Sequence, residues 1–451
     1  MSTPCSTNVK RAAFAALLLL SSAAQAVDDA HLDWWRESRF GLFVHFGLYA
    51  LPARHEWVKS KERIDDAAYD RYLKYFNPDL FDAREWARKA KAAGMKYAVI
   101  TSKHHEGFCL FDSAFTDYKS TNTPFGRDIL REFVEAFRAE GLKVGFYYSL
   151  PDWHHPDFTV DRYHPRRPVD CSPWDKKGME GPEEPWDRLN EGKDMARYRK
   201  YLFSQVEELL TKYGKIDLMW FDFTMPGPRT KHSEDWNARE LLALVRRLQP
   251  GIIVNDRLGL KDGDFGDFVT PEQQVQKKWV ERDGKRVPWE MCQTFSGSWG
   301  YHRDEKTWKS PKDVVRILVQ CVSHGGNLIL NVGPTGRGEF DYRACERLDA
   351  VGEWMKRNSR SIYSCTEAPG KFKAPEGTIL TYNPALNRLY LHLDKYPVSP
   401  LAIDFADEVE YAQFLHDASE IRIADGALVL PKAPPRSEMP VVELFIKGDA
   451  S

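Results

Sequence analysis

Residues 217–223 read DLMWFDF, an apolar run that delivers a carboxylate, Asp222, close to its end. Six other short apolar runs along the chain also end in polar or aromatic side chains. The seven runs lie at 40–44, 97–101, 143–146, 217–221, 251–254, 288–295 and 325–334. Strands of a β/α barrel present their functional groups at their C-terminal ends. We therefore expect these polar and aromatic clusters to converge at one end of a barrel.

Segments with helical periodicity separate the apolar runs, at 82–93, 128–140, 194–213, 233–248, 311–323 and 342–357. Alternation of strand and helix argues for a parallel sheet with right-handed crossovers, and the length favours a closed barrel over an open sheet. Only seven strands are recognisable. We predict an α/β fold with an irregular (β/α)8-like TIM barrel over residues 27–358.

The pattern changes after Ile362 to short alternating runs at 378–382, 388–393, 420–423, 427–430 and 441–446. Asn, Asp, Gly and Pro separate them at turn spacing, which predicts a C-terminal antiparallel β-sandwich over 359–451. One long stretch, 153–194, has neither period and follows the third strand, so it lies on the functional face of the barrel. We interpret it as a specificity loop; a passive surface excursion is the alternative.

The N-terminus has the features of an export signal. Lys10 and Arg11 precede an apolar stretch at 12–20 and a small-residue site, Ala24-Gln25-Ala26. The stretch is too short to span a bilayer. We expect residues 1–26 to be a signal peptide cleaved near Ala26, which places the mature protein in a periplasm or outside the cell. A buried N-terminal helix is the alternative.

Charge and cysteine content exclude several classes of protein. The 451 residues carry 64 basic and 66 acidic side chains, a net charge of −2. The chain therefore lacks the excess of positive charge that is typical of proteins that bind nucleic acid or an anionic membrane. The mature cysteines are scattered and lack CxxC spacing. We expect buried free thiols or one or two disulfides among them: Cys109, Cys171, Cys292, Cys321, Cys345 and Cys365.

Asp222 has the setting of a catalytic carboxylate, two residues after Trp220 at the end of an apolar strand. A helix cap or an ion pair is the alternative role. Aromatic rings beside polar groups suit the C–H faces of sugars. Hydrolysis of a glycosidic bond needs a second carboxyl group to protonate the leaving oxygen. Glu272, in GDFVTPEQ, is our preferred candidate because a loop donor can reach a leaving group, and Glu290, in PWEMCQTF, is the second candidate.

The histidines at the strand ends fit sugar binding better than metal binding. His104 and His105 are adjacent, so within a strand they would point to opposite faces, and the chain has no HxH or HExxH spacing. Neutral imidazoles can bond buried sugar hydroxyls. We therefore predict no metal and no organic cofactor.

Eight stretches together resemble the retaining α-L-fucosidases of glycoside hydrolase family 29. They are RFGLFVHFGLYALPARHEWV, KYAVITSKHHEGFCLFDS, VGFYYSLPDWH, LMWFDF, VNDR, GDFVTPEQ, WEMCQTFSGSWGY and GGNLILNVGP, in the family's order. The resemblance implies that Asp222 is the nucleophile and that the TPE run makes Glu272 the acid/base, with a preference for branched α-1,3/1,4 linkages. It further implies a fucose pocket lined by His45, Glu56, Trp57, His104, His105, Tyr148, Trp220, Arg257 and Trp299. One departure is Phe223, where many relatives have glycine after the aspartate.

The resemblance leads us to expect an exo-glycosidase that releases terminal α-L-fucose from oligosaccharides or glycoconjugates by double displacement. Two hypotheses from other classes stay open. One is a sugar-binding protein without turnover, and the other is a metal-dependent barrel hydrolase that uses the histidines. The sequence does not give the oligomeric state.

Overall fold

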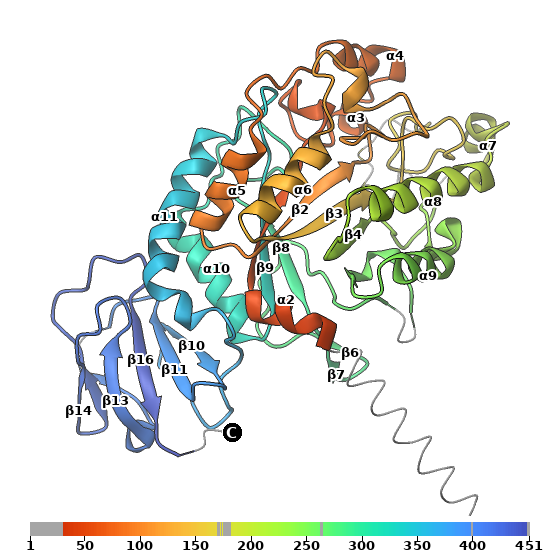
Figure 1. Ribbon diagram of the computed structural model, residues 1–451. Helices are drawn as coiled ribbons and strands as arrows, with labels where there is room; N and C mark the ends of the chain where they lie inside the picture. The colour runs from red at the N-terminus through yellow and green to blue at the C-terminus, as the bar shows by residue number, and fades with distance from the viewer. Residues whose placement is uncertain are drawn as a thin grey trace, which may run out of the picture.

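A curled, parallel seven-stranded sheet forms the centre of the computed structural model (Figure 1). The structure describes residues 30–168, 172, 174, 182–261, 265–397 and 400–448, so the expected signal peptide and Cys171 lie outside it. The strand order is β5-β4-β3-β2-β1-β9-β8. The strands are β1 (Phe40–Val44), β2 (Tyr97–Lys103), β3 (Lys143–Ser149), β4 (Leu218–Asp222), β5 (Ile253–Val254), β8 (Glu290–Thr294) and β9 (Asn327–Val332). The prediction of an irregular TIM-like barrel with seven regular strands is confirmed.

An extended segment, 268–272, lies between the two end strands β5 and β8. Phe268 bridges Asn255 just after β5, while Val269 bridges Trp289 and Glu272 bridges Cys292 of β8. The main chain supports this position, because the N–H of Cys292 donates to the carbonyl of Pro271 over 3.3 Å. The segment, which we call the seam, occupies the place of an eighth strand with isolated bridges instead of a continuous ladder.

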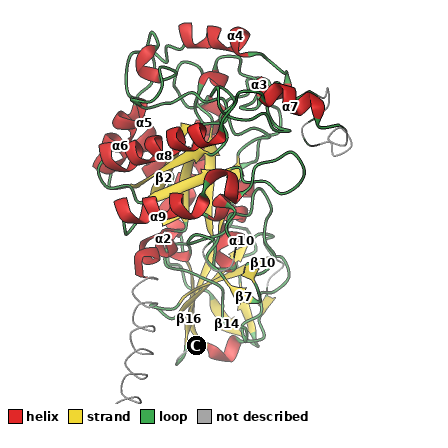
Figure 2. Cartoon of the chain, turned by 90° about the vertical axis from the view of Figure 1, so that its right-hand side faces the viewer, coloured by secondary structure: helices red, strands yellow, loops and turns green. Residues whose placement is uncertain are grey.

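Helices cover the outside of the sheet (Figure 2). Those that follow a strand are α5 (Ala83–Ala92), α6 (Ile129–Ala139), α8 (Met195–Lys212), α9 (Ala238–Leu248), α10 (Pro311–Ser323) and α11 (Tyr342–Asn358). A side-chain oxygen accepts from a first-turn N–H at five of these helices, from the N-cap residues Asp82, Asp128, Asp194, Ser310 and Asp341. Shorter elements are α2 (Asp33–Ser38), α3 (Val58–Lys61), α4 (Asp66–Tyr69), α7 (Glu184–Asn190) and the hairpin β6 (Glu281–Arg282) and β7 (Lys285–Arg286).

Strand side chains alternate between two apolar cores. The inner core fills the barrel with residues such as Phe43, Val99, Tyr147 and Trp220. The outer core packs the opposite face of each strand against the helices. Side chains point alternately to the two faces of a strand. Every second residue of a strand therefore faces the interior of the barrel, and the residues between them face the helices.

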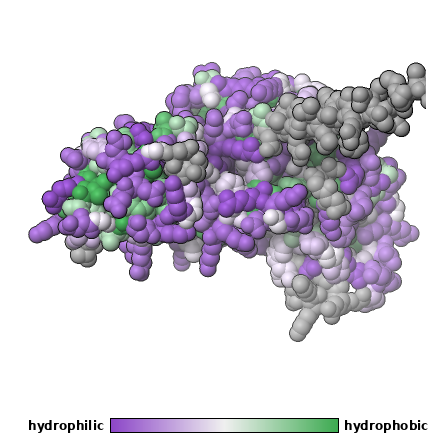
Figure 3. Space-filling view, turned by 90° about the horizontal axis from the view of Figure 1, so that it is seen from below, coloured by the Kyte–Doolittle hydropathy of each residue, from purple (hydrophilic) through white to green (hydrophobic). Residues whose placement is uncertain are grey.

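The C-terminal part forms two antiparallel sheets with a core of their own, as predicted for a sandwich. One contains β10 (Thr378–Asn383), β11 (Arg388–Leu393), β16 (Val441–Ile446) and β13 (Val409–Phe414), and the other contains β12 (Leu401–Ala402), β15 (Ala427–Val429) and β14 (Arg422–Ala424). They join the barrel through α10 and α11, where Trp354 Nε1 donates to the carbonyl of Met439 over 2.9 Å. From below, the surface is mainly hydrophilic, with a hydrophobic patch at the side of these sheets (Figure 3).

Five cysteines lie within the described residues, and all five are free thiols: Cys109, Cys292, Cys321, Cys345 and Cys365. Four of them are buried.

No helix in the described part of the chain combines the length and the apolar character that crossing a membrane requires.

Candidate active site

A cavity at the C-terminal ends of the strands spans about 560 Å³ of empty space, part of which is open to solvent. Residues from most strands of the barrel line it, together with residues from the loops that follow them. The lining residues are Phe43, His45, Trp57, His104, His105, Tyr147, Trp174, Trp220, Asp222, Phe223, Met225, Arg257, Glu272, Cys292 and Trp299. The predicted convergence of strand ends on one site is therefore present in the structure.

Asp222 ends β4 and faces the cavity with its side chain 15% exposed. Tyr147, on the neighbouring strand β3, donates a hydrogen bond to Oδ2 over 2.8 Å, and Arg257 Nη1 donates to Oδ1 over 3.2 Å. Burial raises the pKa of Asp222 from 3.8 to about 6, and the attraction of Arg257 opposes the rise. The carboxylate is thus ionised near neutral pH, yet poorly solvated and supported at both oxygens.

Arg257 joins Asp222 to the second carboxylate. Its Nη2 donates to Glu272 Oε2 over 3.1 Å, while its Nε is fixed by Thr270 Oγ1 at 2.7 Å. The Glu272 side chain is 45% exposed and belongs to the seam, so it lies at the open side of the cavity. One guanidinium therefore holds a buried and a half-exposed carboxyl group at the same site.

Phe223, directly after Asp222, adopts a backbone φ of 85°, a conformation that costs a residue with a Cβ about 1–3 kcal/mol. Its ring lies 4.8 Å from the ring of His105, 5.3 Å from Trp57 and 4.6 Å from Tyr163. Trp174, from the predicted specificity loop, packs 5.6 Å from Trp57 and remains 52% exposed. These aromatic residues form a wall at the mouth of the cavity, which we call the aromatic wall.

His104 and His105 both line the cavity, with ring centroids 4.1 Å apart. The expectation that they point to opposite faces is wrong, because β2 ends at Lys103 and the chain turns, with Gly107 N–H bonded to the carbonyl of His104. Burial holds the pKa of both imidazoles well below the usual value of 6.5. Both are therefore neutral near pH 7.

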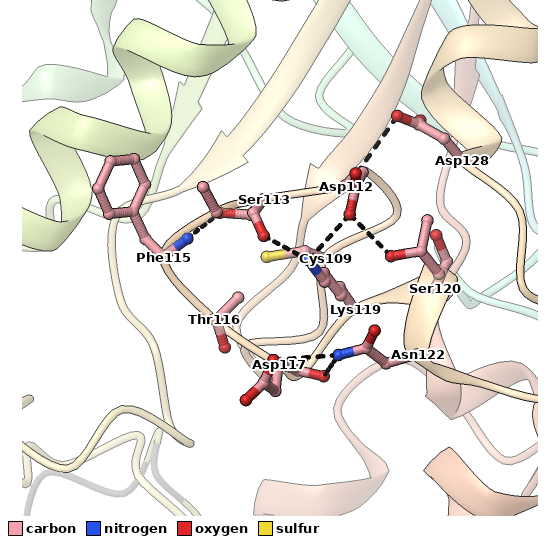
Figure 4. A network of polar contacts seen from close by, with 12 residues as sticks. Cys109, Asp112, Ser113, Phe115, Thr116, Asp117, Lys119, Ser120, Asn122 and Asp128 are labelled. Carbon is pink, nitrogen blue, oxygen red and sulfur yellow. Dashed lines mark hydrogen bonds and ion pairs between the residues drawn. The ribbon is translucent and has the colours of Figure 1, made fainter.

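A dense polar network stabilises the loop that follows the two histidines (Figure 4). The Lys119 ammonium donates to the carbonyl of Ser113 over 2.7 Å and pairs with Asp112 at 2.8 Å. Ser113 Oγ in turn donates to Glu208 of α8 over 2.8 Å. The loop that follows His104 and His105 is thus bonded to helix α8 on the outside of the barrel.

His45 follows β1 and contacts the ring of Trp299 at 5.2 Å, and both line the cavity with Trp57. Glu56 does not line it, although we expected it to bind the sugar directly. Its Oε2 accepts from Ser298 Oγ and from the N–H groups of Trp299 and Gly300, at 2.8 to 3.2 Å. Glu56 therefore acts on the site through the loop that carries Trp299.

Tyr148 does not reach the cavity, which corrects the sequence-based expectation. Its hydroxyl donates to Gln205 of α8 over 2.8 Å, on the outer face of β3. Tyr147 takes the inner position, stacked 5.8 Å from Trp220. Since Trp220 and Asp222 face inward, the parallel pairing of Tyr147 with Trp220 decides which tyrosine joins them.

Glu290, the second candidate for the proton donor, opens β8 at the amino end of the barrel and is not among the residues lining the cavity. It is fully buried and accepts hydrogen bonds from Trp35 of α2 and from the hydroxyl of Tyr97. Burial raises its pKa to about 7. Its position at the opposite end of the strands makes it a poor candidate for protonating a leaving group.

Sequence reasoning did not single out two polar residues that support the site, Ser149 at the end of β3 and Asn331 in β9. They bond His105 and His45, respectively, each at 2.6 Å. Strand alternation could have identified them. Ser149 lies two residues after Tyr147 and Asn331 two residues after Ile329, and both of these earlier residues face the barrel interior. Within the described residues, no group of three or more His, Cys, Asp or Glu side chains is arranged to hold a metal ion.

Comparisons with known proteins agree on one family. A family model described as Alpha-L-fucosidase matches residues 19–360. The structure is similar to α-L-fucosidase isoenzyme 1 from Paenibacillus thiaminolyticus, with 43% identity and a TM-score of 0.84 over 93% of this chain and 100% of that one. It is also similar to a Bacteroides thetaiotaomicron family 29 α-L-fucosidase trapped as a covalent intermediate with 2-fluoro-fucosyl fluoride in a Glu-to-Gln mutant. That match has 29% identity and a TM-score of 0.79 over 93% and 97% of the two chains. Tissue α-L-fucosidase of Rattus norvegicus is 31% identical over 390 residues, which cover 78% of this chain and 77% of that protein.

Proposed function

The chain belongs to the α-L-fucosidase family of glycoside hydrolases, and we propose that it releases terminal α-L-fucose by double displacement, with Asp222 as nucleophile and Glu272 as acid/base. The observation that carries this proposal is the bridge of Arg257 between the two carboxyl groups at the mouth and floor of one cavity. The substrate is a fucosylated oligosaccharide or glycoconjugate.

In the first step, an oxygen of Asp222 attacks the anomeric carbon and forms a glycosyl ester, while the bond from that carbon to the leaving oxygen breaks. Glu272 gives its proton to the leaving oxygen. The half-exposed position of Glu272 on the seam suits contact with a leaving group that extends toward solvent. Tyr147 and Arg257 keep the attacking carboxylate ionised and oriented.

In the second step, Glu272 takes a proton from water, and the water oxygen attacks the anomeric carbon. The ester bond breaks, Asp222 leaves as a carboxylate, and Glu272 is protonated again. Both displacements invert the anomeric centre, so the released fucose has the configuration of the substrate.

Azide tests the two assignments through the stereochemistry of its products. With an aryl α-L-fucoside, Asp222→Ala should lose several orders of magnitude in rate, and azide should restore turnover by direct attack, which gives the inverted β-fucosyl azide. Glu272→Ala should still form the fucosyl enzyme, and azide should release it as the retained α-fucosyl azide. Glu290→Ala serves as the comparison and should give no azide product. A retained azide from Glu290→Ala, or near full turnover by Asp222→Ala, would refute the proposal.

We also propose that the aromatic wall favours branched α-1,3/1,4 linkages. Phe223 narrows the cavity beside Asp222, and the exposed face of Trp174 is available to the sugar that carries the fucose. Release of fucose from α-1,2, α-1,3, α-1,4 and α-1,6 linked oligosaccharides tests this. Equal kcat/KM for linear α-1,2 and branched substrates would contradict it.

We also propose a site of signal-peptide cleavage and the domain boundaries of the mature chain. We place signal cleavage near Ala26, the catalytic barrel at 27–358 and the C-terminal sandwich at 359–451. N-terminal sequencing of the protein secreted from its own host tests the cleavage site. An intact N-terminus on the secreted protein would argue against cleavage at this site.

A further inference from the structure

Two imidazoles of the cavity are bonded through Nδ1 to polar groups that are themselves fixed. His45 Nδ1 lies 2.6 Å from Asn331 Oδ1, and His105 Nδ1 lies 2.6 Å from Ser149 Oγ. All four side chains are buried. Which ring nitrogen of a neutral histidine carries the proton is set by the bond that the other nitrogen makes.

The Asn331 amide can adopt only one orientation. Its Nδ2 donates to the carbonyl of Trp299 over 2.6 Å. A carbonyl accepts only, so the NH2 group must face Trp299 and Oδ1 must face His45. Since Oδ1 also accepts only, Nδ1 of His45 must carry the proton.

The same reasoning applies to Ser149, whose hydroxyl has a single proton. Ser149 Oγ donates to the carbonyl of Pro151 over 2.7 Å. If the proton pointed to His105 instead, two oxygen lone pairs would face each other at that distance. Ser149 therefore accepts a hydrogen bond from a protonated Nδ1 of His105.

Both rings then carry an unprotonated Nε2. His45 and His105 line the cavity, and Nε2 of His105 lies 3.9 Å from Asp222 Oδ2. Burial lowers the pKa of His45 to about 4 and that of His105 well below 6.5, so neither ring gains a second proton near neutral pH.

We propose that Asn331 and Ser149 are positioning residues that fix His45 and His105 as hydrogen-bond acceptors, so that the site selects a sugar that presents two hydroxyl donors to them. The identity of this sugar rests on the proposed fucosidase function. The tautomers do not, since they belong to the protein without ligand. A hydroxyl that could only accept would find no donor on either ring.

Nitrogen NMR of the ligand-free protein, labelled at histidine with 15N, reads the tautomers directly. His45→Asn and His105→Asn variants assign the signals. We expect both rings to be protonated at Nδ1 between pH 6 and pH 8. Ser149→Ala should shift His105 toward the Nε2-protonated form, and Ser149→Thr, which keeps the hydroxyl, should restore it. Nε2 protonation of both rings in the unsubstituted protein would overturn the proposal.

Ser102→Ala is the matched control. Ser102 is buried on the adjacent strand, and its hydroxyl donates to the carbonyl of Tyr147 over 2.6 Å without touching an imidazole. It should leave both tautomers unchanged. A shift of His105 in Ser102→Ala as large as in Ser149→Ala would indicate general loosening of the strand ends and overturn the assigned role of Ser149.

Fluorinated sugars test the selection of donors. Replacing a hydroxyl of fucose by fluorine removes a donor and keeps a weak acceptor. We expect 3-deoxy-3-fluoro and 4-deoxy-4-fluoro fucose to inhibit at least about tenfold less well where the hydroxyl faces an imidazole, the scale of a lost hydrogen bond. Equal inhibition by fucose and both analogues would overturn the proposed selection. Failure of the protein to hydrolyse any fucoside, with Nδ1 tautomers intact, would count against the proposed function and leave the positioning roles standing.

Discussion

The hydroxyl of Tyr147 donates a 2.8 Å hydrogen bond to Oδ2 of Asp222 from the neighbouring strand. Both side chains face the barrel interior, because parallel pairing aligns β3 with β4 in this register. The bond favours the ionised carboxylate and opposes the burial that raises its pKa to about 6. The reactivity of the proposed nucleophile thus depends on a residue that forms no covalent bond to the sugar.

The activity should fall at acid pH as Asp222 becomes protonated, with a midpoint of kcat/KM near pH 6. Tyr147→Phe should move this midpoint to higher pH, because the variant lacks a hydrogen bond that lowers the pKa of Asp222 in the unsubstituted enzyme. It should also reduce kcat/KM about 10- to 100-fold, the range of a hydrogen bond to a charged group. The measurement is the pH dependence of aryl fucoside hydrolysis from pH 4.5 to 8.

Tyr148→Phe is the control for that variant, since the neighbouring tyrosine loses only its bond to Gln205 on the outer face. It should reduce the melting temperature and leave the pH profile of the folded enzyme unchanged. Identical profiles for Tyr147→Phe and the unsubstituted enzyme would contradict the role given to Tyr147.

Asp222→Asn should stabilise the protein near neutral pH while it abolishes turnover. The pKa of Asp222 rises on folding from 3.8 to about 6, so the favourable contribution of its protonated form is complete below about pH 4 and is lost as the pH rises through 6. This corresponds to roughly 3 kcal/mol of stability that the ionised carboxylate lacks. Urea unfolding at pH 5 and pH 7.5 checks it, and an advantage of the variant that does not grow with pH speaks against this origin.

Phe223 offers a test of backbone strain that is separate from packing. Phe223→Ala and Phe223→Gly both remove the ring, but only glycine adopts a φ of 85° without cost. The glycine variant should therefore be about 1 kcal/mol more stable than the alanine variant. Both should lose discrimination between linkages to the same extent. Equal unfolding free energies would show that the conformation at this position carries no strain.

Glu290→Gln should retain the activity of the folded enzyme, whereas Glu272→Gln should lose most of it on substrates with poor leaving groups. The reason is position, because Glu290 accepts from Trp35 at the amino end of the barrel. Hydrolysis of a fucosylated disaccharide, with a dinitrophenyl fucoside as the activated comparison, separates the two residues. Equal losses on the disaccharide would conflict with the positions of these carboxyl groups.

Much of this architecture follows from pattern alone. The six predicted helices all occur, and the runs around Asp222 and His45 are strands, because periodicity reports burial directly. Side-chain direction near strand ends was harder to predict. Tyr147 and Tyr148 are chemically alike, and only the pairing of β3 with β4 distinguishes them. The two histidines both reach the cavity because the chain turns after Lys103, and that turn has no periodic signature.

Long-range contacts explain where the structure departs from the sequence-based expectations for other residues. Glu56 and Glu290 looked like site residues by type, but distant partners fix them: the loop at Ser298 for one and Tyr97 with Trp35 for the other. The strand β13 (Val409–Phe414) was not predicted, since two apolar residues, Tyr411 and Ala412, stand side by side in it and its pairing with β16 shifts register between Val409 and Tyr411. The contacts of Glu56 and Glu290 join residues 193 to 255 positions apart, beyond the reach of any local pattern.

The two carboxyl groups differ in how firmly strand pairing holds the segments that carry them. Asp222 ends a strand paired on both sides, whereas Glu272 belongs to a segment joined to its neighbours by single bridges. Insertions and deletions are absorbed most easily where few ladder bonds must be rebuilt. Sequence changes can therefore reshape the side of the site where we place the leaving group, and so change which glycans are cleaved, while the strand that carries the proposed nucleophile keeps its geometry.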